Sequence, residues 1–190
     1  MTPSQRHVIW NKEDDLNWDI IEISKVNNKM IKRLIENLKK DISERFFISF
    51  ESLIKISRIK NIKKLLENSF RVMDDNDWHR DLLKFILKYI KNKELKHPLA
   101  YQLYHPDFIK RVRAILQAEH DNSVEYKRII LPLLDDPDDS VRWAALNYFI
   151  NLGQVDEREI QNKLKLRQER EINKTILQKI TQNLKKIQAR

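Results

Sequence analysis

The chain has 190 residues, of which 41% are hydrophobic and 34% charged, with a net charge of +9 and no cysteine. This length suits one compact or solenoidal domain, or two very small ones, and the missing cysteine excludes disulfides, thiolate metal ligands and a cysteine nucleophile. Gly153 is the only glycine. Because tight hairpins and phosphate-cradling loops depend on glycine, the composition favours an all-α fold.

The positive charge is concentrated at the two ends of the chain. Residues 1–70 carry 14 Lys/Arg and 10 Asp/Glu, residues 71–160 carry 14 and 16, and residues 161–190 carry 9 and 2. A basic end attracts phosphate or an acidic partner, and a solvated lysine-rich helix face has the same composition. Acidic residues among the first 30 argue against a secretory leader, and no apolar run approaches the roughly 20 residues of a membrane span. We therefore expect a cytoplasmic protein with no membrane span and no cofactor.

Apolar residues spaced by three and four predict four helices in the N-terminal part. They lie over residues 16–23, 30–38, 46–54 and 59–66. The opening segment His7–Trp10 is too short for a helix, so it is an extended arm or a capping strand.

Three acidic turns at intervals of about 31 residues indicate an internal repeat. They cover residues 74–77, 104–107 and 135–138, and an apolar-periodic segment follows each. Asp and Asn accept hydrogen bonds from the free N–H groups of a helix start, and Pro fits its first turn. The same acidic turn at a fixed interval predicts a repeated helix–turn–helix unit.

Two later segments carry apolar residues along one helix face. The first face comprises Val141, Ala144, Ala145, Tyr148, Phe149 and Leu152. The second, in a last helix of four turns or more, comprises Ile172, Ile176, Ile180, Leu184 and Ile187.

Residues 129–152 resemble a HEAT repeat, including the short HEAT-like repeats of phycobilin lyases. An apolar helix ends at Asp136-Pro137-Asp138, and the next begins with Val141-Arg142 followed by small residues. Residues 105–120 match in part, with His105-Pro106-Asp107 and Val112-Arg113-Ala114. The resemblance implies an α-α superhelix (HEAT-like solenoid) of about four or five helix pairs. Residues 1–73 would form an N-terminal helical cap with atypical repeats, and residues 74–190 HEAT-like repeats ending in a basic capping helix, all in one continuous solenoid.

In HEAT repeats the arginine of this motif usually pairs with a turn or neighbouring-repeat carboxylate, which makes a ladder along the stack. We place Arg113 and Arg142 at this position, with Asp107 or Asp138 as partner. Alternatively, both arginines face the groove and hold a phosphate or carboxylate.

Tryptophans next to carboxylates raise one enzymatic hypothesis. DNA-alkylation-repair glycosylases are built from HEAT-like repeats and use tryptophans with an aspartate. Trp78 and Asp81 lie one turn apart on a helix, and Trp143 begins a later inner helix. An inter-repeat tryptophan is more often part of the core.

Metal binding is not predicted. The acidic turn at residues 135–139 lacks the glycine and the distal glutamate of a calcium loop, so helix capping explains it better. His97, His105 and His120 do not have the spacing of convergent zinc ligands.

Lys163, Arg167, Arg170 and Lys174 recur at steps of four, three and four, so one continuous helix would align them into a basic stripe. Such a stripe could contact phosphates. The candidate binding residues are therefore Arg113, Arg142, Trp143, Lys163, Arg167, Arg170 and Lys174.

The sequence favours a non-enzymatic HEAT-repeat binding protein, an adaptor, scaffold or inhibitor of another macromolecule, most simply a protein. A small immunity or antitoxin-like inhibitor fits this class by size. The alternative is nucleic-acid binding through the basic ends, with or without glycosylase chemistry. A third hypothesis, from the phycobilin-lyase resemblance, is the handling of chromophore proteins.

Overall fold

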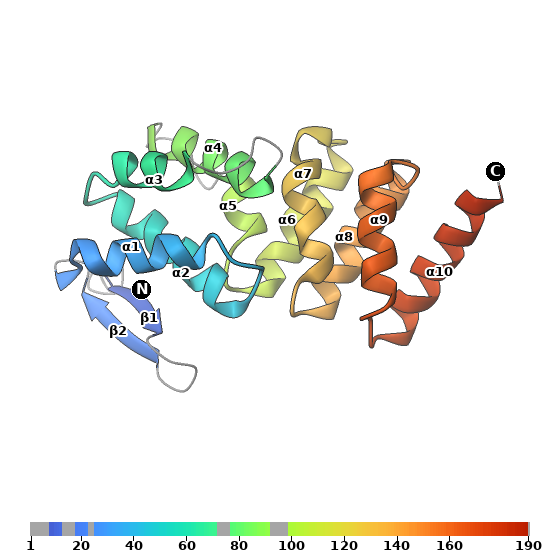
Figure 1. Ribbon diagram of the computed structural model, residues 1–190, viewed down its shortest axis with the longest axis horizontal. Helices are drawn as coiled ribbons and strands as arrows, with labels where there is room; N and C mark the ends of the chain where they lie inside the picture. Colours follow the sequence, from blue (N-terminus) through green and yellow to red (C-terminus); the bar gives the residue numbers. More distant parts are fainter. Residues whose placement is uncertain (1–7, 13–17, 23–24, 72–76, 92–98, 190) are drawn as a thin grey trace. The chain divides into compact units, whose positions relative to one another are not determined.

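The computed structural model describes residues 8–12, 18–22, 25–71, 77–91 and 99–189. It divides into two compact units, Met1–Pro106 and Asp107–Arg190, called unit 1 and unit 2 below. Apart from one two-stranded ribbon, the regular elements in these described ranges are helices, so the all-α prediction is confirmed (Figure 1). The predicted boundary between residues 73 and 74 lies outside the described residues, and that division stays a prediction.

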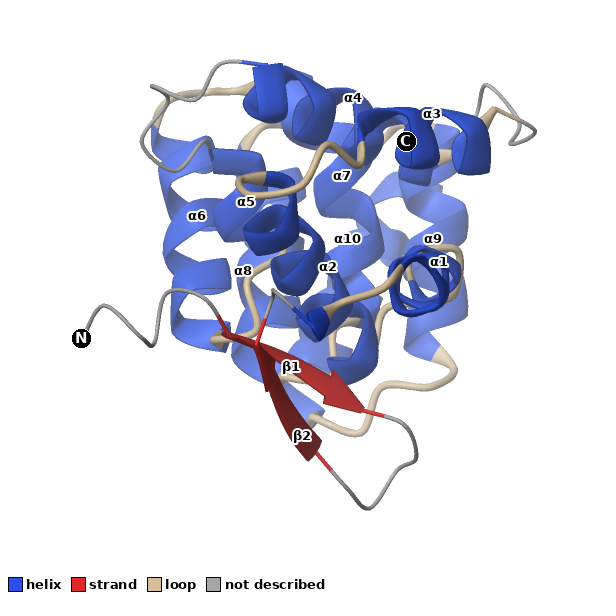
Figure 2. Ribbon diagram, turned by 90° about the vertical axis from the view of Figure 1, so that its left-hand side faces the viewer, coloured by secondary structure: helices blue, strands red, loops and turns tan. Residues whose placement is uncertain are grey.

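The ribbon in unit 1 pairs β1 (Val8–Lys12) with β2 (Trp18–Glu22) in antiparallel register. It lies against α2 (Glu44–Ser57), and Figure 2 shows it in red beside the helices. The strand alternative for the opening segment is therefore confirmed over residues 8–10, while His7 lies outside the described residues. The helix predicted over residues 16–23 is wrong where the structure describes it, because Trp-Asp-Ile-Ile-Glu is rich in the aromatic and β-branched residues that favour strands.

The remaining elements of unit 1 are helices. They are α1 (Asn28–Asn37), α2, α3 (Lys63–Phe70), α4 (Trp78–Lys91) and α5 (Leu99–Leu103). Side-chain oxygens of Asn27 and Ser43 accept hydrogen bonds from N–H groups in the first turns of α1 and α2. The two helices predicted over residues 30–38 and 46–54 are confirmed, whereas the one predicted over residues 59–66 begins only at Lys63.

Unit 2 has two layers of elements. One layer holds α6 (Phe108–His120), α8 (Asp139–Asn151) and α10 (Lys174–Gln188), with α8 in contact with both neighbours. The other holds α9 (Arg158–Gln168) and a segment that continues from the 3₁₀ turn η3 (Val124–Tyr126) through α7 (Lys127–Ile130) to a second 3₁₀ helix, η4 (Leu131–Asp135). Pro132 stands at the start of η4, where its missing N–H interrupts α-helical bonding.

Two helices of unit 2 end in the same turn. Asn122 follows α6 with φ of 50°, and Gly153 follows α8 with φ of 66°. In each case the next residue bonds back into the helix, Ser123 N to Ala118 O at 2.9 Å and Gln154 N to Phe149 O at 2.9 Å. The two turn residues are 31 positions apart, as the sequence repeat requires.

Most residues of the two predicted apolar faces lie in the core of unit 2. Of the α8 residues predicted to be buried, all but the half-buried Leu152 are fully buried. Of the face predicted for the last helix, Ile176, Ile180 and Leu184 are buried and Ile187 is half-buried, but Ile172 is 87% exposed. The prediction for Ile172 is wrong because α10 begins only at Lys174, which leaves Ile172 in the preceding turn.

Candidate functional site

A buried ion pair joins α8 to the turn before α10. Arg142 is only 5% exposed, and its Nε and Nη2 donate to the two carboxylate oxygens of Glu171, each at 2.9 Å. Its Nη1 donates to the backbone oxygens of Asp136 and Pro137 at 2.9 and 3.1 Å. Paired, bidentate geometry of this kind is what allows a charged group to be buried. The Arg142 side chain is thus fully engaged inside unit 2.

The same ion pair occurs one repeat earlier. Arg111, 31 residues before Arg142, is buried, and its Nε and Nη2 donate to the two oxygens of Asp136 at 2.9 Å each. Asp136 and Glu171 both stand two residues before a helix cap and accept the N–H of that cap residue at 2.9 Å. Each arginine therefore connects one helix of the α6–α8–α10 layer to the turn that starts the next.

The predicted ladder of arginines is present, but with different members. Arg111, not Arg113, is equivalent to Arg142, and Arg113 is exposed. The predicted partners Asp107 and Asp138 instead cap their own helices, where they accept N–H groups two residues on at 3.0 and 2.9 Å. The Val-Arg dipeptide does not mark equivalent arginines in the two repeats. The arginine lies four residues after the cap in both repeats, and counting from the cap identifies Arg111.

Two residues of the predicted basic stripe are bound within this network. Arg167 Nε donates to Glu171 at 2.9 Å, and its Nη1 lies 3.6 Å from Asp135, which also accepts from Lys163. Burial alone would raise the pKa of Glu171, but the bonds from Arg142, the Asn173 N–H and Arg167 outweigh it and lower the pKa to about 2. Lys163 and Arg167 thus stabilise the carboxylates at this end of the ladder.

The stripe is not continuous. The helix α9 ends at Gln168 and α10 starts at Lys174, so Arg170 lies in the turn between them. Arg170 and Lys174 are both exposed. The prediction of a single aligned stripe is wrong because it assumed one helix through residues 163–174.

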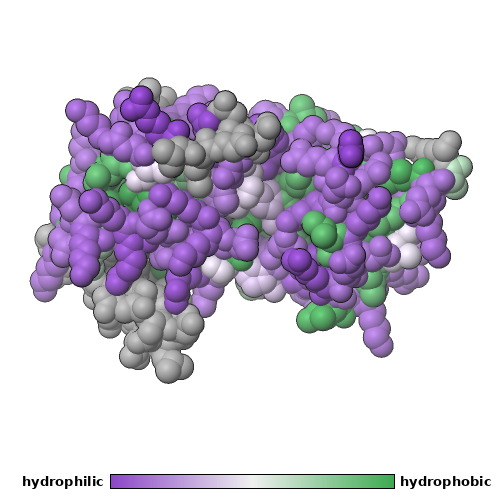
Figure 3. All heavy atoms as spheres, viewed as in Figure 1, coloured by the Kyte–Doolittle hydropathy of each residue, from purple (hydrophilic) through white to green (hydrophobic). Residues whose placement is uncertain are grey.

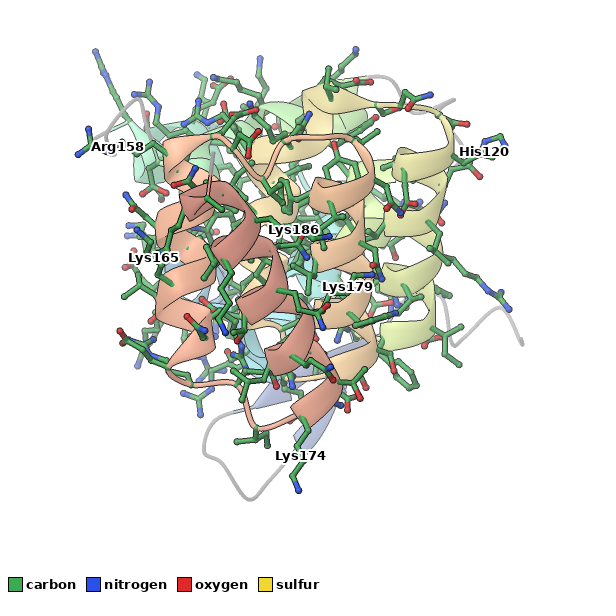
Figure 4. All side chains as sticks on the ribbon, turned by 90° about the vertical axis from the view of Figure 1, so that its right-hand side faces the viewer. His120, Arg158, Lys165, Lys174, Lys179 and Lys186 are labelled. Atoms are coloured by element: carbon green, nitrogen blue, oxygen red, sulfur yellow. The ribbon has the colours of Figure 1, made fainter. Side chains whose placement is uncertain are left out.

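The exposed side of α8 and α10 brings together a different set of residues, called the α8–α10 face. It comprises Trp143, Asn147, Ile150, Lys179 and Lys186, of which Lys186 is exposed and the others are half-buried. The ammonium of Lys179 lies 4.4 Å from the centroid of the Trp143 ring and donates to the Asn147 Oδ1. Figure 4 shows Lys179 and Lys186 toward the α8 side of α10, whereas Lys165 lies on α9.

The opposite layer has a different surface. In Figure 3 the part of unit 2 over α7 and α9 is mostly hydrophilic, with small, separate hydrophobic areas. Scattered apolar residues of this kind are normal on a protein surface. The α8–α10 face is therefore the more distinctive surface, because it gathers an indole ring, an isoleucine and two cations.

Trp78 and Asp81 lie in unit 1. The Trp78 ring stacks on His79 and on Tyr104, with centroid separations of 3.7 and 5.8 Å, within an aromatic cluster that includes Phe46. The Asp81 carboxylate accepts a hydrogen bond from Lys84 at 2.8 Å. The tryptophan thus serves the core of unit 1, and base-excision chemistry at this pair stays a prediction.

His105 and His120 each lie beside a different carboxylate. In unit 1 His105 Nε2 lies 3.8 Å from Glu51, whereas the exposed His120 in unit 2 pairs with its neighbour Asp121 at 3.0 Å. His97 lies outside the described residues. Within the described ranges no group of three or more His, Asp or Glu is placed to hold a metal ion.

No protein-family model matches the chain, and no similar protein of curated function or of solved structure was found. Among the helices that the structure describes, none combines the length and apolarity needed to cross a membrane.

Proposed function

We propose that the chain is a non-enzymatic HEAT-like repeat protein that binds another protein through the α8–α10 face. An adaptor, a scaffold and an inhibitor all fit this description. HEAT-like stacks expose a long row of helices whose side chains form extended binding surfaces.

The repeat part of this proposal is supported by two recurring devices in unit 2. One is the arginine four residues after each cap, paired with an acidic residue in the following turn. The other is the left-handed turn residue at Asn122 and Gly153, at the same interval of 31. Because the arginines of α6 and α8 fix each of these helices to the turn that starts the next, the exposed side chains of α8 and α10 are held in a defined arrangement.

Trp143 is the observation that carries the binding proposal. Its ring is half-buried, as is Ile150, whereas the other large apolar residues of α8 are buried, and the ring lies against the Lys179 ammonium. Tryptophan is among the residues most enriched at the centres of protein–protein interfaces. A rigid ring beside Ile150 and a fixed cation provides both apolar area and a polar contact.

A pull-down from a lysate of cells in which the protein naturally occurs tests this function. Immobilised wild-type protein is compared with Trp143→Ala and with the control Leu166→Ala, which removes an exposed apolar side chain of α9. We expect a partner protein that is still recovered after nuclease treatment. The wild type and the control should retain it at about 150 mM salt, and Trp143→Ala should lose it. Recovery of nucleic acid alone, or equal recovery by all three proteins, would reject it.

A further inference from the structure

The cations of the α8–α10 face are not neutralised by nearby carboxylates. Lys163 and Arg167 pair with Asp135 and Glu171 inside the ladder. By contrast, Lys179 has an amide oxygen and an aromatic ring as its neighbours, and within residues 107–189 no carboxylate forms an ion pair with Lys179 or Lys186. This face therefore has positive charge in excess, and an acidic ligand would complement it.

The Lys179 ammonium is held in place with donor capacity left over. It carries three N–H donors, of which one is used by Asn147 while the Trp143 ring covers one side of the group. These two contacts restrict the side chain before any ligand arrives, which lowers the entropy lost on binding. A carboxylate that contacts Lys179 would also lie against the edge of an apolar ring.

Lys179 and Lys186 share one side of α10 because they are seven residues, or two helical turns, apart. At a rise of 1.5 Å per residue, their Cα atoms are about 10 Å apart. A peptide in the polyproline II conformation has three residues per turn and rises by about 3.1 Å per residue, so residues i and i+3 lie on the same side, about 9 Å apart. Carboxylates three residues apart along such a segment would therefore match both cations.

We propose that the α8–α10 face binds an acidic protein segment with two carboxylates three residues apart, one at Lys179 and one at Lys186. Apolar side chains between them contact Trp143 and Ile150. This inference rests on the proposed function and adds the chemistry of the partner. A protein segment fits better than a polyanion backbone because the face has two cations and an aliphatic side chain, Ile150, in addition to the indole ring, whereas nucleic-acid sites line up several cations along a phosphate chain.

Fluorescence anisotropy with the full chain and a labelled acidic peptide of about 12 residues, long enough to extend beyond both cations, tests this proposal. The peptide carries Glu at positions i and i+3 with Leu between them. A matched peptide has Gln in place of Glu, and single-stranded oligothymidylate of equal charge represents a polyanion. The acidic peptide should bind, the Gln peptide should bind about tenfold more weakly or not at all, and the oligonucleotide should bind less tightly than the acidic peptide.

Three variants complete the test. Lys179→Gln and Lys186→Gln should each weaken peptide binding about tenfold, and Lys165→Gln, an exposed cation on α9, should leave it within about twofold. Lys186 is exposed, so its variant remains informative even if Lys179→Gln unfolds. Equal losses in all three variants, or equal binding of oligonucleotide and peptide, would overturn the proposal.

The two proposals can fail separately. If the acidic peptide does not bind but Trp143→Ala still loses a protein in the pull-down, only the acidic partner is rejected. If neither experiment depends on the α8–α10 face, the proposed function is rejected as well.

Discussion

Arg142 and Glu171 form a bidentate ion pair in which both side chains are almost fully removed from solvent. Arg142 belongs to α8, and Glu171 belongs to the turn that starts α10, 29 residues later. Because Arg142 also donates to the backbone of the turn before its own helix, three segments meet at one guanidinium. This pair positions α10 against α8, and with it the face that we propose as the binding surface.

Removing one partner of this pair should be strongly destabilising. We expect Glu171→Gln to lower the free energy of unfolding by about 3–5 kcal/mol, because Arg142 is left buried without a counter-charge. Urea unfolding followed by circular dichroism measures the change. Glu169→Gln, which alters an exposed carboxylate two residues away, should change stability by less than about 0.5 kcal/mol.

The equivalent pair one repeat earlier allows a double-mutant cycle. Arg111→Met should lower the free energy of unfolding by about 3–5 kcal/mol because it leaves Asp136 buried and unpaired. Adding Asp136→Asn removes that buried charge while keeping an oxygen for the Asp138 N–H. The double variant should therefore be more stable than Arg111→Met alone. Additive losses would show that the two side chains do not interact.

Stability should fall in acid through Glu171. Its pKa is about 2 in the folded protein against 4.5 in the unfolded chain. The stabilisation from its charge is therefore complete above about pH 4.5 and is lost as pH falls toward 2, by on the order of 2–3 kcal/mol. In Glu171→Gln the decline over the same range should be shallower. Parallel curves for the two proteins would contradict this assignment.

Tyr148 should influence the free energy of unfolding at high pH. Burial, with a smaller effect from Glu125, raises the pKa of Tyr148 to about 12, and its hydroxyl donates to Ser123 O at 2.8 Å. Because the unfolded chain ionises this group near its usual value of 10.0, the stability it contributes is lost as pH rises from 10 toward 12. Tyr148→Phe should cost about 1 kcal/mol at neutral pH and flatten this alkaline decline. Chemical unfolding at neutral pH and between pH 10 and 12 measures the two effects.

The sequence predicts most helices because their signals are local. The Asp107 and Asp138 caps, and the apolar face of α8, need only residues within a few turns of each other. The β2 strand is not predicted, because strand pairing depends on residues that are distant in the sequence. Ile20 fits both a helical and an extended pattern, and its pairing with Trp10 across the ribbon is a tertiary choice.

The site was harder to predict because its contacts are long-range. The HEAT-like motif identifies Arg142, but its partner Glu171 is 29 residues away and lies in a turn that lacks the Asp-Pro signature. Trp143 is also a sequence candidate, but the sequence around it gives no indication of its contact with Lys179. The two meet because the α8–α9 and α9–α10 turns return α10 to the side of α8.

Photo-crosslinking of the recovered partner is the most direct test of the binding face. Benzoylphenylalanine is placed at position 150 on the α8–α10 face and, separately, at position 166 on α9. We expect a protease-sensitive, nuclease-resistant adduct from position 150 and little or none from position 166. An adduct from position 166 alone, or a nuclease-sensitive adduct from position 150, would contradict it.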